Sequence, residues 1–252
     1  MRKYTGFVTA TILTFIACFI FVASADQQTS LSALQQALKQ ASQSFNGINT
    51  YTAKVILEER HGGKIKGKEI VRAACTKKPF RLYFHWLDGG LYAGLQVSHD
   101  RRRDGANQLQ ALESGVRGMV GVTTWSLDSR IIRTFYPHHF KLTQYDLGFL
   151  LQHVADVLEK ATAKGKIKVA DRGIATNIIP GRRVHVFAIE LSENPSDGLL
   201  YRRSVLGFDT ATHLPRLVET YNFNDKLHAR YVVEELKINP SIDENIFTLK
   251  KN

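Results

Sequence analysis

The sequence has little cysteine, with only Cys18 and Cys75 in 252 residues. Cys18 lies inside an apolar N-terminal run, so Cys75 is the only thiol left once that run is removed. An intramolecular disulfide is then excluded, and stability has to come from packing. We expect Cys75 to be a buried, inert residue of a strand, because an activated thiol needs a nearby base or a positive electrostatic environment.

Motifs of nucleophilic and nucleotide chemistry are also missing. No Gly-x-Ser-x-Gly sequence occurs, which removes the serine nucleophile elbow. Gly115, Gly118 and Gly121 lack the Lys-Ser/Thr pair of a phosphate-binding loop. Strands and helices do not alternate regularly along the chain, which argues against a doubly wound nucleotide-binding sheet.

Metal-ligating and paired acidic residues have the wrong spacing for catalysis. His138-His139 is the only histidine pair, and it lacks the spacing and further ligands of a zinc site, so no metal and no cofactor is expected. In Glu58-Glu59 and in Glu234-Glu235 the neighbours point to opposite faces of a strand. Carboxylates that meet across strands keep an envelope hydrolase as the third-ranked alternative.

The N-terminus has the three parts of a secretory signal. Arg2 and Lys3 precede the apolar run Phe7–Val22, and Ala23-Ser24-Ala25 supplies small residues at the cleavage position. We predict a signal peptide over 1–25 and an exported, most simply periplasmic, soluble protein. The run of about 16 residues is shorter than the roughly 20 that span a bilayer, and an uncleaved anchor is the alternative. Cys18 lies within the run, so lipidation is not expected.

Two segments have apolar residues at helical spacing. The first is Thr29–Phe45, with Thr29 or Ser30 available as N-cap and Asn46-Gly47 at its end. The second runs from about Gln144 to Ala163, and Gly165 ends it. Both are predicted to be amphipathic helices. The apolar stripe of the second helix consists of Leu147, Leu150, Leu151, Val154, Leu158 and Ala161.

Short strand-like runs separated by turn residues occupy most of the remaining chain. Connections of two to four residues cannot make parallel crossovers, so an antiparallel meander is expected. We interpret 114–124 as an irregular loop that leads to a strand near 130–135. The other predicted strands are 51–60, 65–77, 80–87, 91–99, 109–113, 167–170, 183–191, 200–208, 216–223 and 227–237.

Period-two alternation gives several strands one apolar face. In Phe80–Leu87 the even positions are Phe80, Leu82, Phe84 and Trp86, and Val55 with Leu57 and Leu206 with Phe208 follow the same pattern. The predicted fold is therefore α+β: a large curved antiparallel sheet of about ten strands, an open half-barrel covered by two amphipathic helices. With no internal repeat and no long linker, a single domain over 26–252 is expected.

Basic residues exceed acidic ones and give a formal net charge of +11. They are dispersed, whereas a nucleic-acid binder concentrates them on one arm or helix, so no nucleic-acid partner is expected. Lys64, Lys66 and Lys68 alternate and are predicted to share one strand face. They are candidates for contact with anionic lipid headgroups or another polyanion, including a peripheral membrane contact. A plain solvated surface is the alternative.

The order of elements, together with several short motifs, resembles the LolA/LolB-like superfamily of exported bacterial lipoprotein carriers and sensors, and most closely a domain-of-unknown-function family within it. The resemblance covers about the whole chain after the signal. The motifs that carry it are Glu59-Arg60, Gly67-x-Glu69, Pro79-Phe80-Arg81-Leu82-Tyr83, Thr143–Leu151, Asp209 with Leu214-Pro215-Arg216, and Asn239–Phe247.

The resemblance implies a non-enzymatic protein that shelters an acyl chain of a lipid or of a lipid-modified protein in an apolar concavity. Each buried CH₂ contributes about 0.8 kcal/mol, so a modest cavity suffices for reversible binding. A filled core is the alternative at each position, and a regulatory or sensor protein that binds an envelope protein is the alternative function. The expected lining is Val55, Leu57, Phe80, Leu82, Phe84, Trp86, Leu150, Val154, Leu158, Leu206 and Phe208.

Overall fold

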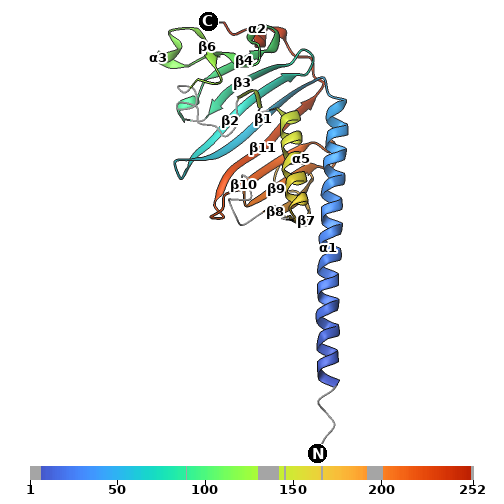
Figure 1. Ribbon diagram of the computed structural model, residues 1–252. Helices are drawn as coiled ribbons and strands as arrows, with labels where there is room; N and C mark the ends of the chain where they lie inside the picture. The colour runs from blue at the N-terminus through green and yellow to red at the C-terminus, as the bar shows by residue number, and fades with distance from the viewer. Residues whose placement is uncertain are drawn as a thin grey trace, which may run out of the picture.

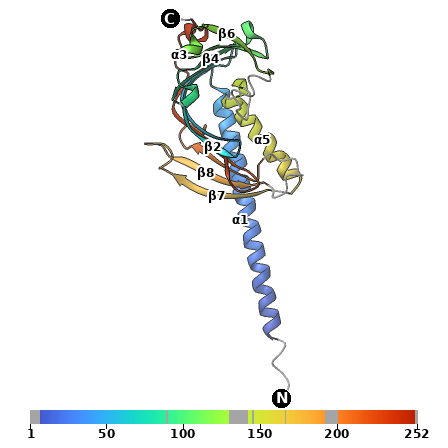
Figure 2. The same ribbon diagram turned by 90° about the vertical axis from the view of Figure 1, so that its left-hand side faces the viewer.

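One open antiparallel sheet dominates the computed structural model, which describes residues 7–88, 90–129, 142–144, 146–165, 167–191 and 201–250. Eleven strands are hydrogen-bonded in the order β6-β5-β4-β3-β2-β1-β11-β10-β9-β8-β7. The first strand of the chain, β1, therefore pairs with the last, β11. Figures 1 and 2 show a strongly curved sheet that does not close. The predicted fold class is therefore confirmed.

The strands follow the expected meander, with short turns between neighbours. Their bounds are β1 Thr50–His61, β2 Lys64–Thr76, β3 Arg81–Asp88, β4 Gln96–Asp100, β5 Gln108–Leu112, β6 Val122–Ser126, β7 Lys168–Ala175, β8 Val184–Glu190, β9 Arg203–Asp209, β10 Pro215–Tyr221 and β11 Leu227–Ile238.

Two long helices lie on the concave side of the sheet, as the amphipathic patterns predicted (Figure 2). Helix α1 spans Phe7–Asn46 and ends where expected, but it is continuous with the apolar N-terminal run and projects far from the sheet (Figure 1). Helix α5 spans Leu147–Ala163. Short helical turns complete the described structure: η1 Gly90–Tyr92, α2 Arg101–Asp104, α3 Gly115–Gly118, η2 Leu142–Gln144 and η4 Glu244–Phe247.

Two local predictions were wrong. The segment expected to be an irregular loop contains helix α3 and strand β6, whose residues Val122–Ser126 pair with β5 from Leu112 back to Gln108. The strand expected over 91–99 begins only at Gln96, because residues 90–92 form a 3₁₀ turn. The strand expected near 130–135 lies outside the described residues.

The concave face carries two hydrophobic clusters. Over β1–β6 the apolar side chains pack against one another and include the buried aromatic residues Phe84, Trp86 and Trp125. Over β7–β10 the sheet packs against both long helices, with Leu34 of α1 and Leu158 of α5 buried there. Both helices thus cover the half of the sheet from β11 to β7, and Phe45 of α1 and Leu147 of α5 also reach the first cluster.

The convex face has a smaller apolar cluster under the β7–β8 connection. Ile179 from that connection covers Val184, Leu217 and Val232. Gly207 is on β9, between Val184 of β8 and Leu217 of β10, and a Cβ there would stand 2.7 Å from Val184 Cγ1 and 3.0 Å from Leu217 Cβ. The glycine therefore lets β8 and β10 bring their branched side chains together on this face.

Candidate functional site

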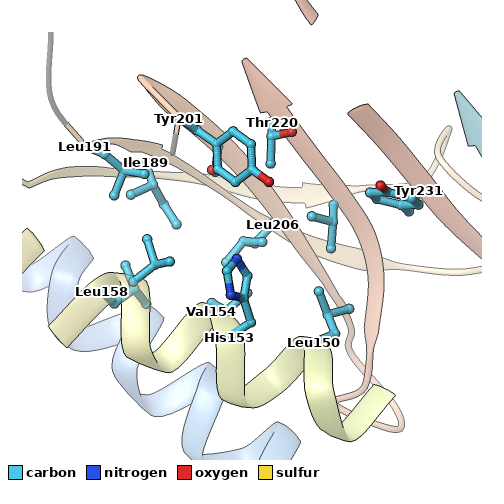
Figure 3. Close-up of a pocket in the computed structure, with 13 residues that line it drawn as sticks. Leu150, His153, Val154, Leu158, Ile189, Leu191, Tyr201, Leu206, Thr220 and Tyr231 are labelled. Atoms are coloured by element: carbon cyan, nitrogen blue, oxygen red, sulfur yellow. The ribbon is translucent and has the colours of Figure 1, made fainter. Parts of the chain in front are cut away.

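A groove lies between α5 and the concave face of the C-terminal strands. Figure 3 shows Leu150, Val154 and Leu158 of α5 facing Leu206 and Ile189 of the sheet across it. The space between them is about 560 Å³ including the open mouth. The complete lining is Leu150, His153, Val154, Val157, Leu158, Ile189, Leu191, Tyr201, Ser204, Leu206, Val218, Thr220 and Tyr231.

A second apolar pocket adjoins the first at the N-terminal end of α5. Its volume is about 660 Å³ including its mouth. Leu150, His153 and Tyr231 line both pockets, so the two form one groove along the helix. We call this combined space the α5 groove. The remaining residues of the second pocket are Tyr51, Ala53, Val55, Ala73, Gln144, Asp146, Leu147, Phe149 and Val233.

Local sequence fixes the position of α5 over the sheet. Asp146 caps the helix, and its Oδ1 accepts hydrogen bonds from Gly148 N at 2.7 Å and Phe149 N at 3.1 Å. A hydrogen bond also joins the start of α5 to the sheet, because Leu147 N donates to Tyr51 Oη of β1 at 3.2 Å. Gly148 permits close approach of α1, since a Cβ there would stand 2.7 Å from the Phe45 ring.

Few polar groups line the groove, and burial shifts the pKa of four of them. It raises the pKa of Tyr51 and of Asp146 in the second pocket. Burial raises the pKa of Tyr201 to about 12, with the charge of Glu59 adding to the rise. Burial also lowers the pKa of His153, which favours its neutral imidazole. The hydroxyl of Thr220 is buried, and Thr220 Oγ1 makes no hydrogen bond within the part of the chain that the structure describes. The groove is thus largely apolar, with a small number of hydrogen-bonding groups and with Asp146 as its one acidic lining residue among those described.

A buried carboxylate stands next to the groove without lining it. Glu59 of β1 accepts a hydrogen bond from the hydroxyl of Tyr231, and His61 Nε2 lies 3.1 Å from the other carboxylate oxygen. Glu69 of β2 accepts a hydrogen bond of 2.7 Å from Trp86 Nε1. The hydrogen bond to Glu59 holds Tyr231, one of the three residues shared by both pockets, by its hydroxyl end.

Five of the eleven predicted lining residues lie at the α5 groove. Val55 lines the second pocket, and Val154, Leu158 and Leu206 line the first. Leu150 lines both, and each of the five comes from a stripe or alternation recognised in the sequence.

The other six predicted residues are placed in packed side-chain clusters. Phe208 packs beneath α1 and α5. The remaining five belong to the β1–β6 half, where Phe80 is partly buried and packs edge-on against His99 with ring centroids 5.9 Å apart. None of the six is among the residues that line the two described pockets, and those from the β1–β6 half are Leu57, Phe80, Leu82, Phe84 and Trp86.

The three lysines of β2 are exposed, but they do not share one strand face as predicted. Lys68 lies opposite Glu58, whereas Lys64 lies opposite His61, and the register shifts between these pairs. Directly opposed residues point to the same face, and faces alternate along β1, so Lys64 and Lys68 point to opposite faces. Gly67, with φ of 103°, accommodates the irregularity next to Lys66.

Sequence reasoning missed the polar lining of the groove. His153 stands one position before Val154 on α5, and its helical position beside Leu150 was the available signal. Tyr231 faces the same side of β11 as Val233, which the period of two would have indicated. Tyr201 precedes β9, which begins at Arg203. The strand predicted over 200–208 placed Tyr201 on the face opposite to Leu206 and Phe208, so the alternation pointed away from it.

Cys75 is buried, as expected. Its side chain is 1% exposed, and burial raises the pKa of its thiol to about 12, so the thiolate is disfavoured at neutral pH. Among the described residues no group of three or more His, Cys, Asp or Glu side chains is arranged to hold a metal ion. His138-His139 lies outside those residues.

The chain belongs to the family described as Protein of unknown function (DUF1571), whose model matches residues 48–252. This confirms the resemblance to a domain-of-unknown-function family. No curated protein matches the sequence. In the described part of the chain, no helix combines the length and the apolar character required to span a membrane.

The chain is also similar to solved structures at low sequence identity. The Mycobacterium tuberculosis lipoprotein LppX has 8% identity and a TM-score of 0.48, over 84% of this chain and 99% of that one. A LolA superfamily protein from Nitrosomonas europaea has 13% identity and a TM-score of 0.32, over 85% and 96%. The MucA/MucB complex of Pseudomonas aeruginosa includes a chain with 14% identity and a TM-score of 0.45, over 84% of this chain and 59% of that one.

Proposed function

We propose that the protein is a non-enzymatic binding protein of the cell envelope that holds an acyl chain, of a lipid or a lipid-modified protein, in the α5 groove. The observation that carries the proposal is the continuity of the two apolar pockets through Leu150, His153 and Tyr231. An acyl chain is long, narrow and apolar, and it fits a space that follows one face of a helix.

The energetics support reversible binding. Each methylene that moves from water into the groove contributes about 0.8 kcal/mol, so about ten methylenes supply roughly 8 kcal/mol before the costs of association. Thr220 offers a buried hydroxyl to an ester or hydroxyl group at the polar end of such a ligand. No charged side chain lines the first pocket, so a ligand need not displace an ion pair to enter.

The proposal includes export, with residues 1–25 as a cleaved signal peptide. The positive start, the apolar run and Ala23-Ser24-Ala25 support it. Within residues 27–46 of α1, Leu34, Ala37 and Ala41 are buried against the sheet and α5. Cleavage after Ala25 would therefore leave these three packed residues on the domain.

The first test is native mass spectrometry of the protein purified from an envelope fraction without detergent, followed by lipid extraction. A discrete acyl-bearing adduct in defined stoichiometry supports the proposal, and the polypeptide mass reports whether residues 1–25 are removed. A clean apo mass, together with no uptake of dansyl-undecanoic acid, would contradict lipid binding and favour the alternative of a regulator that binds an envelope protein.

The second test places the same bulky residue on two sides of α5. Leu150→Trp fills the groove where its pockets meet, whereas Ala155→Trp adds the indole to an exposed position of the same helix. We expect Leu150→Trp to weaken binding of dansyl-undecanoic acid by at least about tenfold, or 1.4 kcal/mol, and Ala155→Trp to leave it unchanged. Equal affinities in the two variants would place the ligand elsewhere.

A further inference from the structure

The connection between β5 and β6 exposes an unusual group of apolar side chains. Val116 is 83% exposed, Met119 71% and Val120 78%. A single exposed apolar residue is ordinary, but three within five residues at a hairpin end form a patch that a soluble surface does not require. We call Val116, Met119 and Val120 the apolar tip.

Sheet topology places the apolar tip among other hairpin ends. In an antiparallel meander the β1–β2, β3–β4 and β5–β6 connections all lie at the same end of the strands. Ser114 Oγ donates to Ala93 O at 2.5 Å, which joins the tip to the β3–β4 connection. Leu87, at the end of β3, is a further apolar residue at this end and is 40% exposed. Figure 1 shows α3 and the β1–β2 hairpin on the same side of the molecule.

Cations accompany the exposed apolar residues. Lys64, Lys66 and Lys68 of the β1–β2 hairpin are exposed at this end of the sheet, on whichever face they point. Within the tip, Arg117 keeps 56% side-chain exposure while it forms an ion pair of 3.0 Å with Glu113. Asp88, at the end of β3, is an exposed acid at the same end. The three exposed lysines of the β1–β2 hairpin therefore outnumber Asp88 at this end.

We propose that the apolar tip inserts into the interface of a bilayer that contains anionic lipid, with the lysines of the β1–β2 hairpin at the headgroups. Exposed apolar side chains at a hairpin end match an interface that offers a fluid apolar layer below charged headgroups. A lysine near such a surface gains about 1 kcal/mol, about a fivefold increase in affinity. This docking surface is independent of ligand binding in the α5 groove.

The experiment uses the full chain and tryptophan fluorescence with vesicles whose acyl chains are brominated. Both native tryptophans, Trp86 and Trp125, are at most 8% exposed and give a constant background. Met119→Trp reports on the tip. Ile174→Trp is the matched control, because Ile174 is also an exposed apolar residue, at 49%, but lies toward the opposite end of the sheet on β7. The background of the unmodified protein is subtracted from both.

In vesicles of phosphatidylcholine and phosphatidylglycerol, we expect quenching of about twofold for the added emission of Met119→Trp and none for Ile174→Trp. Val116→Asp combined with Val120→Asp should abolish the quenching, and phosphatidylcholine alone should give less. No quenching of Met119→Trp, or equal quenching at both positions, would overturn the proposal, as would equal quenching in the two lipid mixtures. The comparison is valid whether or not the N-terminal segment anchors the chain, because both reporters share that segment.

Discussion

The buried ion pair between Asp209 and Arg216 gives a sharp test of how the C-terminal strands are held. Both side chains are 2% exposed, and Arg216 Nη2 lies 3.2 Å from Asp209 Oδ2. Arg216 Nη1 donates to Val233 O at 3.2 Å, so the arginine also joins β10 to β11. Asp209 Oδ1 accepts from the backbone N–H groups of Ala211 and Thr212 at the β9–β10 turn.

We predict that Asp209→Asn destabilises the protein by about 3–5 kcal/mol, because it leaves the guanidinium buried and unpaired. The amide oxygen of asparagine can still accept the two hydrogen bonds from the turn, so the measured cost reports the loss of the negative charge and not the loss of those hydrogen bonds. At 2–4 °C per kcal/mol for a chain of this size, the melting temperature should fall by about 6–20 °C. Asp225→Asn is the control: its partner Arg203 lies at 3.2 Å, but Asp225 is 50% exposed, and the expected cost is below about 1 kcal/mol.

Urea unfolding followed by circular dichroism measures both variants, and a cost below about 1 kcal/mol for Asp209→Asn would show that the buried pair does not stabilise the C-terminal strands. Adding Arg216→Met should recover about half of the loss, since no unpaired charge then remains.

The dependence of stability on acidic pH provides a second test of the same pair. Burial raises the pKa of Asp209, but the backbone N–H groups and Arg216 outweigh it and lower the pKa below its ordinary value. The pair's stabilisation is therefore present above about pH 4 and is lost as the pH falls, so the variant should lose less stability on acidification.

Two further predictions concern α5 and the thiol. Asp146→Ala removes the N-cap acceptor of Gly148 and Phe149 and should cost about 1 kcal/mol in urea unfolding, whereas Asp146→Asn should cost only a few tenths. Cys75 should resist a maleimide reagent in the native protein at pH 8 and react once urea unfolds it, because its thiol is buried and burial raises its pKa to about 12. Peptide mapping would measure the labelling. Labelling at equal rates in both states would contradict the assigned burial.

Much of the sheet could be predicted because apolar residues at every second position show which face of a strand is turned toward the core. Alternation in Phe80–Leu87 predicted strand β3 and its apolar face, and Leu82, Phe84 and Trp86 are all buried. Strand β6 could not be recognised this way. Its sequence of Val, two Thr, Trp and Ser has one buried side chain, Trp125, so a sheet edge leaves almost no alternating pattern.

Register irregularities defeated the prediction for the lysines. Period-two reasoning assumes an unbroken ladder, and the shift between Glu58 and Arg60 opposite Gly67 reverses the face from one side of the irregularity to the other. A glycine inside a strand pattern was the available warning. The ion pair was equally hidden, because Asp209 and Arg216 are seven positions apart, and only the β9–β10 turn brings them together.

The location of the groove follows from side-chain size more than from the apolar face itself. Both halves of the concave face alternate in the same way, yet much of the β1–β6 half is filled by large rings such as Phe84, Trp86 and Trp125. Under α5 the sheet carries small residues instead: Ser204 and Thr220 in the first pocket, and Ala53 of β1 and Ala73 of β2 in the second. Small residues on the sheet below a helix held at a fixed distance leave a volume that the protein does not fill itself. The sequence pattern identifies the face, and the volume of each residue on it decides between core and binding site.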